Sequence, residues 1–176
     1  LIVRDRHALE AIIHGGGQQF GIRPGTENVP GIVALGRAAE LAAREQPECA
    51  ARIARLRDDL EARFLAAVPD AVVNGRNAPR APQTVSFSIP GADGEALLMH
   101  LDLAGIACSG GSACSTGSVE PSHVLTAMGL GRELGSAALR FSLGRESTAA
   151  DVDALIDAIP RVVAKVRSLT GALGRA

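Results

Sequence analysis

Residues 84–108, TVSFSIPGADGEALLMHLDLAGIAC, carry the pattern that decides the fold. Apolar and polar residues alternate over 84–89, which predicts a half-exposed strand, and the Pro-Gly pair that follows ends it. Asp93 is placed to cap a helix over about 94–104. The short apolar run 106–108 indicates another strand. A strand, a helix and a strand therefore follow one another within 25 residues.

The flanking residues extend this pattern in both directions. Upstream, apolar residues at helical spacing predict an amphipathic helix over 49–67. Pro47 is expected to separate it from an earlier helix over about 32–44. The remaining expected elements are a short strand at 71–73, a short helix from Pro121 to Met128, a strand at 138–143 and a long helix over about 149–166. From residue 48 onward this order predicts an α+β fold, a small sheet with helices packed on it.

Composition limits the classes of protein that this chain can belong to. The chain has 176 residues with a formal net charge of −1, so it lacks the basic surface of a dedicated nucleic-acid-binding protein. No apolar run approaches the ~20 residues of a membrane-spanning helix. The three cysteines form no CxxC pair, which argues against a disulfide scaffold or a cysteine-rich zinc site and favours a reducing, cytoplasmic location.

Two absences bear on the chemistry. The chain begins at Leu1 rather than Met, which we take to mean that it does not begin where its gene does. Lys165 is the only lysine, and no glycine-rich turn precedes it as in a phosphate-binding P-loop. A reaction that needs a lysine Schiff base must therefore take that lysine from outside this chain.

Cys114 gives the strongest local signal for chemistry. It lies in a run of small residues at 109–118, SGGSACSTGS, which predicts an exposed loop. Reactive thiols lie in accessible positions of this kind, so a nucleophilic role is one interpretation and a surface loop that happens to contain cysteine is the other. Cys108, at the end of an apolar run, is more simply a small core residue. A disulfide between the two is sterically conceivable but disfavoured in the cytoplasm.

Two further features point to anions. Arg140 interrupts an apolar strand, where burial would require either a substrate carboxylate or an acidic side chain as its partner. The glycine-rich segment 14–26 offers backbone N–H groups, Arg23 and the Thr26 hydroxyl, which could cradle a phosphate. A tight turn between a strand and a helix is the simpler interpretation of that segment.

Three segments together resemble a known family. RPGTENVPGIVALGRA (23–38), SGGSACSTGSVEPSHVL (109–125) and LRFSLGRESTAADVD (139–153) resemble the C-terminal portion of the NifS/IscS-like cysteine desulfurases, within the class V aminotransferases. The resemblance implies a homodimeric enzyme of PLP fold type I. By that resemblance, residues 1–45 are the end of the large PLP-binding domain with a connecting helix, and residues 46–176 are the small C-terminal domain.

The resemblance also implies roles for three residues. Cys114 matches the cysteine that attacks the sulfur of L-cysteine held on pyridoxal 5'-phosphate, which releases L-alanine and leaves a persulfide for transfer to an acceptor or scaffold protein. The same cysteine would contact a nascent iron–sulfur cluster, the only metal contact expected. Arg140 matches the arginine that binds the substrate carboxylate. Thr26 matches the threonine that hydrogen-bonds the cofactor phosphate of the partner subunit.

Some residues depart from the family pattern. Gly110 stands where the family usually has serine, and Cys108 stands where a small residue such as alanine is common. The Schiff-base lysine and the residues that hold the cofactor ring would precede Leu1, so we expect this chain to be inactive alone. An alternative is a separate sulfur-carrier or interaction module that keeps the Cys114 loop without catalysis.

Overall fold

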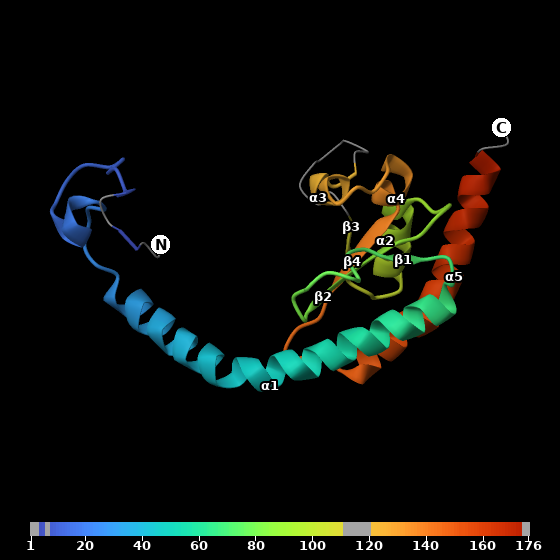
Figure 1. Cartoon of the computed structure of the whole chain (residues 1–176), viewed down its shortest axis with the longest axis horizontal. Helices are drawn as coiled ribbons and strands as arrows, with labels where there is room; N and C mark the ends of the chain where they lie inside the picture. The colour runs from blue at the N-terminus through green and yellow to red at the C-terminus, as the bar shows by residue number, and fades with distance from the viewer. Residues whose placement is uncertain (1–3, 6–7, 111–120, 174–176) are drawn as a thin grey trace. The chain divides into compact units, whose positions relative to one another are not determined.

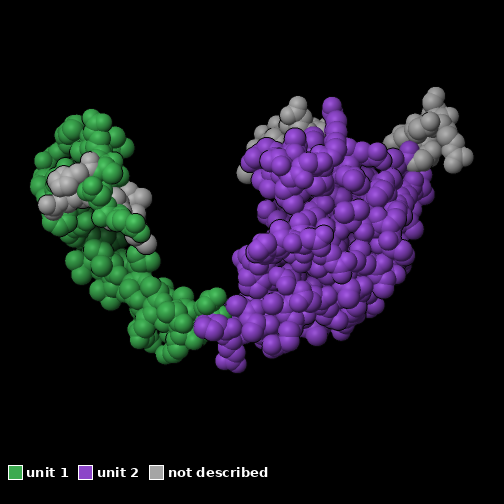
Figure 2. All heavy atoms as spheres, in the orientation of Figure 1, with its two compact units in different colours: residues 1–46 green, residues 47–176 purple. Residues whose placement is uncertain are grey.

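The computed structural model describes residues 4–5, 8–110 and 121–173. The chain divides into two compact units, Leu1–Gln46 and Pro47–Ala176 (Figure 2). The elements, in chain order, are η2 (Gln18–Gly21), α1 (Val29–Ala67), β1 (Val72–Val73), β2 (Thr84–Ser88), α2 (Gly94–Leu103), β3 (Ser109–Gly110), α3 (His123–Ala127), α4 (Arg132–Ser136), β4 (Ala138–Ser142) and α5 (Ala149–Leu173) (Figure 1).

The second unit is built on a four-stranded antiparallel sheet with the order β1-β2-β4-β3. The two longest strands, β2 and β4, pair over their full lengths in the centre. Because side chains alternate along a strand, Val85, Phe87, Leu139 and Phe141 lie on one face of the sheet. All four are buried, so this face forms the core, and the predicted α+β fold is confirmed.

Helices α1, α2 and α5 cover the core face of the sheet. Their apolar side chains join those of the strands in one buried cluster, to which Leu60, Phe64, Leu97, Leu101 and Ile159 belong. Phe64 of α1 stacks on Phe87 of β2, with ring centroids 3.8 Å apart, and Phe141 of β4 lies against both rings. Three of the four phenylalanines of the chain thus meet at the centre of this core.

Pro47 does not end a helix, as the sequence predicted. Helix α1 runs without interruption from Val29 to Ala67 and contains Pro47. A proline inside a helix removes one backbone hydrogen bond. Pro47 is exposed, so water can satisfy the carbonyl group that loses its partner, and the alanine-, glutamate- and arginine-rich residues on both sides favour helix strongly. The prediction of two separate helices was wrong for this reason.

The prediction of a strand at 106–108 was also wrong, because these residues are not in a strand. The strand in this part of the chain is β3, where Ser109 and Gly110 pair with Arg140 and Leu139 of β4. Two small residues that predicted a loop are therefore strand residues, because backbone pairing with a distant segment outweighs local preference. Helix α4 was not predicted, and α5 extends beyond residue 166 to Leu173.

The sequence predicted the N-terminal capping of helices more accurately. Asp93 accepts a hydrogen bond from the backbone N–H of Ala96 and caps α2 as predicted, and Asn28 accepts one from that of Gly31 at the start of α1. The Ser122 hydroxyl caps α3 by accepting from the N–H of Val124, which places the start of this helix at His123 rather than at Pro121. Among the described residues, no helix combines the length and apolar character that a membrane crossing requires.

Candidate functional site

Arg140 lies on the face of the sheet that the core helices leave open. Its neighbours along β4, Leu139 and Phe141, point into the core, so alternation directs Arg140 to the opposite face. The side chain is exposed, and it forms no hydrogen bond or ion pair with the described residues. The expectation that the Arg140 guanidinium is buried was wrong, because only one face of the strand is apolar and Arg140 lies on the other face. Among the described residues, Arg140 is instead an exposed cation without an acidic partner.

Two serines flank Arg140 across the sheet. Ser86 of β2 is its direct partner on one side, and Ser109 of β3 is its direct partner on the other. Directly opposed residues of antiparallel strands project from the same face with Cβ atoms about 4.5–5.5 Å apart. The open face therefore presents a row of hydroxyl, guanidinium and hydroxyl groups. Sequence reasoning did not identify the two serines, because their relation to Arg140 depends on strand register.

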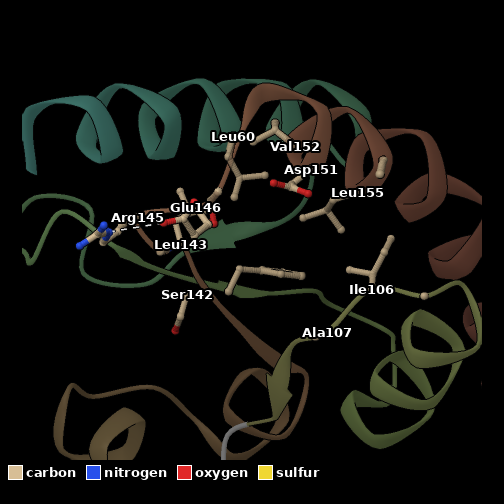
Figure 3. Close-up of a pocket in the computed structure, with 15 residues that line it drawn as sticks. Leu60, Ile106, Ala107, Ser142, Leu143, Arg145, Glu146, Asp151, Val152 and Leu155 are labelled. Carbon is tan, nitrogen blue, oxygen red and sulfur yellow. Dashed lines mark hydrogen bonds and ion pairs between the residues drawn. The ribbon is translucent and has the colours of Figure 1, made fainter. Parts of the chain in front are cut away.

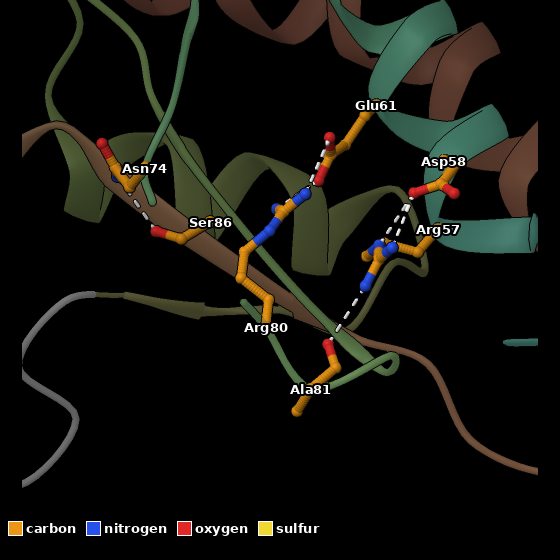
Figure 4. A network of polar contacts seen from close by, with 7 residues as sticks. All are labelled: Arg57, Asp58, Glu61, Asn74, Arg80, Ala81 and Ser86. Atoms are coloured by element: carbon orange, nitrogen blue, oxygen red, sulfur yellow. Dashed lines mark hydrogen bonds and ion pairs between the residues drawn. The ribbon is translucent and has the colours of Figure 1, made fainter. Parts of the chain in front are cut away.

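The buried residue Asn74 forms a hydrogen bond with Ser86, one of the two serines beside Arg140. Asn74, which follows β1, donates from Nδ2 to the Ser86 Oγ at 3.1 Å and to the Ser88 Oγ at 3.0 Å. Its backbone N–H donates to the Ser86 carbonyl oxygen at 2.8 Å. Figure 4 shows the Asn74 side chain directed at Ser86.

Cys114 lies outside the described residues, but the residues on either side of 111–120 are described. On the N-terminal side, β3 ends at Gly110, which pairs with Leu139. On the C-terminal side, Pro121 packs against Gly135 of α4, where an added Cβ would lie only 2.7 Å from the proline Cβ. Ser109, the partner of Arg140, precedes Cys114 by five residues in the sequence. The chain thus ties the Cys114 segment to the strand beside Arg140.

Thr26 belongs to the first unit, where it is exposed after η2. The turn before it is closed by its own side chains. Arg23 donates to the carbonyl oxygen of Gly25 at 2.9 Å and pairs with Glu27 at 2.9 Å. Gly25 has a φ of +99°, a conformation that favours glycine. The guanidinium of Arg23 is thus occupied within the turn.

Cys108 packs against the core cluster, as the sequence predicted for a small core residue. Burial, with a smaller contribution from the nearby Asp102 carboxylate, raises the pKa of the Cys108 thiol to about 11. Both causes disfavour the thiolate, which is the nucleophilic form. Cys108 is therefore not a reactive thiol at neutral pH.

This shift predicts how Cys108 responds to pH. With a pKa of about 11, the thiolate fraction at pH 8 is about one in a thousand and rises about tenfold per pH unit. In the folded Cys114→Ser variant, iodoacetamide should therefore modify Cys108 slowly near pH 8 and markedly faster toward pH 10, as followed by mass spectrometry. Rapid alkylation at pH 7 would contradict the burial of this thiol.

A pocket of about 530 Å³ lies away from Arg140, where the end of β4 meets α1 and α5. The apolar side chains of Leu60, Val152 and Leu155 and the charged side chains of Arg145, Glu146 and Asp151 are among those that line it (Figure 3). In the same view Ser142 points away from the other lining side chains. Because Arg140 does not line it, this pocket is separate from the row of polar groups on the open face.

The described residues do not form a complete cofactor site. The one lysine, Lys165, is exposed on α5, the helix packed against the core face, whereas Arg140 lies on the open face. Within the described part of the chain, no group of three His, Cys, Asp or Glu side chains could hold a metal ion.

Known proteins resemble this chain over most of its length. The aminotransferase class-V family matches residues 12–155. The chain is 46% identical over 170 residues to a cysteine desulfurase of Gluconacetobacter diazotrophicus, and 43% identical over 170 residues to cysteine desulfurase IscS 1 of Archaeoglobus fulgidus. Each alignment covers 97% of this chain, but only 42% and 44% of the two relatives.

Solved structures show the same likeness. A NifS-like protein from Rickettsia africae matches 87% of this chain with a TM-score of 0.75 and 35% identity, over 39% of its own length. DndA from Streptomyces lividans matches 76% of the chain with a TM-score of 0.56 and 37% identity, over 36% of its length. The chain therefore belongs to the aminotransferase class-V family. Within that family its named relatives are cysteine desulfurases, and it spans less than half of their length.

Proposed function

We propose that this chain is the C-terminal part of a pyridoxal-phosphate-dependent cysteine desulfurase, which converts L-cysteine to L-alanine and carries the sulfur as a persulfide on Cys114. The observation that carries the proposal is the exposed Arg140, which has no ion-pair partner among the described residues and lies opposite the strand that leads into the Cys114 segment. The cysteine desulfurases among its relatives support it.

In this proposal Arg140 binds the substrate and Cys114 accepts its sulfur. The Arg140 guanidinium binds the α-carboxylate of L-cysteine through charge-assisted hydrogen bonds, which fixes where the substrate sulfur lies. The Cys114 thiolate attacks that sulfur and becomes the persulfide. The cofactor, when bound, supplies the electron sink for the cleavage of the carbon–sulfur bond. Thr26 hydrogen-bonds the cofactor phosphate across a homodimer.

The rest of the enzyme must complete the site. Since Lys165 lies on the far side of the sheet from Arg140, the Schiff-base lysine comes from outside this chain, and the chain alone is inactive. We further propose a cytoplasmic homodimer that passes sulfur from Cys114 to an acceptor or scaffold protein. In that transfer Cys114 makes the transient contact with a nascent iron–sulfur cluster.

The test compares the intact gene product with this chain alone. Purified intact protein incubated with L-cysteine and pyridoxal phosphate should form one alanine per sulfur released, whereas the chain alone should form none. Alanine formation by the chain alone would refute the proposal that the Schiff-base lysine comes from outside this chain. Absence of alanine from the intact protein would refute the desulfurase activity and favour a non-catalytic sulfur carrier.

A further inference from the structure

We propose that Ser86 is a second substrate-binding residue, whose hydroxyl donates a hydrogen bond to the carboxylate that Arg140 holds, and that Asn74 is the residue that positions it. The proposal rests on the function proposed above and deepens it. It adds a neutral donor beside the cation at the same carboxylate.

The first argument is the register of the sheet. Ser86 and Arg140 are direct partners in the antiparallel pair formed by β2 and β4. Partners of this kind project from the same face, about 4.5–5.5 Å apart at their Cβ atoms. One carboxylate can contact both side chains when it binds on the side of the guanidinium that faces β2, next to the Ser86 hydroxyl.

The second argument is the direction of the Ser86 hydrogen. A serine hydroxyl has one hydrogen to donate and two lone pairs that accept. The Ser86 Oγ accepts from the Asn74 Nδ2 at 3.1 Å, and the Ser86 hydroxyl donates to no group among the described residues. Since an amide N–H occupies the side of the oxygen that faces Asn74, the hydrogen of Ser86 is left for a group on another side.

The third argument is that Asn74 itself is fixed. Its residue is only 7% exposed, and its side chain bonds to Ser88, which is fully buried. The Ser88 hydroxyl in turn donates to the Asn74 Oδ1 at 3.3 Å. The amide nitrogen of Asn74 is directed at both serines, so the Ser86 oxygen accepts from it, and both polar atoms of the amide are engaged.

Ser109, the other neighbour of Arg140, is a poorer candidate. Its hydroxyl donates to the carbonyl oxygen of Gly110 at 3.3 Å, so its hydrogen is already used within β3. No buried amide fixes its orientation among the described residues. The two sides of Arg140 thus differ, and the donor stands on the β2 side. This asymmetry orients a carboxylate that the guanidinium alone would bind with more freedom.

The test measures steady-state kinetics of the intact enzyme with L-cysteine. Ser86→Ala should raise KM about tenfold with kcat changed less than twofold, because the lost bond holds the carboxylate rather than the reacting sulfur. Ser86→Thr keeps the hydroxyl and should recover most of the affinity. Ser168→Ala is the matched control, since it removes an exposed hydroxyl from α5, which packs on the other face of the sheet, and it should leave KM unchanged.

Two competitive inhibitors separate binding from a general structural effect. Ser86→Ala should weaken inhibition by L-alanine, which has a carboxylate, and leave inhibition by cysteamine, which has none, unchanged. Equal weakening of both would overturn the proposal, as would an unchanged KM in Ser86→Ala while Arg140→Ala raises it. The latter result would leave the proposed function standing. If the wild-type enzyme forms no alanine, the proposed function fails and this inference fails with it.

Discussion

Replacement of Cys114 by serine in the intact enzyme should lower alanine formation from L-cysteine at least 100-fold. A hydroxyl is not ionised at neutral pH and is a far weaker nucleophile than a thiolate, so the sulfur of the substrate has no acceptor. The visible absorption of bound cofactor should remain, because the role proposed for Cys114 is to accept sulfur and not to hold the cofactor.

Cys108→Ser provides the matched control. It alters the neighbouring thiol, which is packed against the core and protonated at neutral pH, and it should keep the rate within about twofold of wild type. If Cys114→Ser retains desulfuration and Cys108→Ser loses it, the nucleophile is Cys108, and the assignment of this role to Cys114 is wrong. Loss of cofactor absorption in Cys114→Ser would show that the segment holds the cofactor as well.

Replacement of Arg140 by alanine should lower kcat/KM for L-cysteine roughly 100-fold, equal to about 3 kcal/mol, with most of the change in KM. The arginine is exposed on the open face, so its removal leaves no cavity and no unpaired buried group, and the free energy of unfolding should stay nearly constant. Steady-state kinetics and thermal unfolding of the same samples check both expectations.

Two variants sharpen the result for Arg140. Arg140→Lys keeps the charge but not the forked pair of donors, so it should recover only part of the affinity. Arg161→Ala removes an exposed arginine from α5, which packs on the other face of the sheet, and should have no effect. An unchanged KM for L-cysteine in Arg140→Ala would refute the carboxylate-binding role.

Much of the fold could be predicted from local patterns. The alternation in 84–89 and the apolar segment 138–143 identified the two central strands, and Asp93 correctly marked the start of α2. These signals depend on residues near one another in the chain. The two main errors have non-local causes. Pro47 is tolerated because it is exposed in a long, strongly helical segment, and β3 forms from small residues because β4 offers it backbone partners.

The candidate site was predictable only in part. The motif resemblance identified Arg140, but its environment was predicted wrongly, because the neighbours of a strand residue in sequence lie on the opposite face. Ser86 and Asn74 carried no signal of their own. Their relation to Arg140 arises from strand register and from a hydrogen bond between residues 12 positions apart, which no local pattern specifies.

The intact protein, incubated with L-cysteine, alkylated and digested with trypsin, gives the most direct measurement of the central claim. Because no lysine or arginine occurs between Arg80 and Arg132, residues 81–132 form one tryptic peptide that contains both Cys108 and Cys114. Fragmentation in the mass spectrometer locates any additional sulfur atom on one of the two. We predict it on Cys114 alone. A peptide without additional sulfur, or with the sulfur on Cys108, would contradict the proposed function.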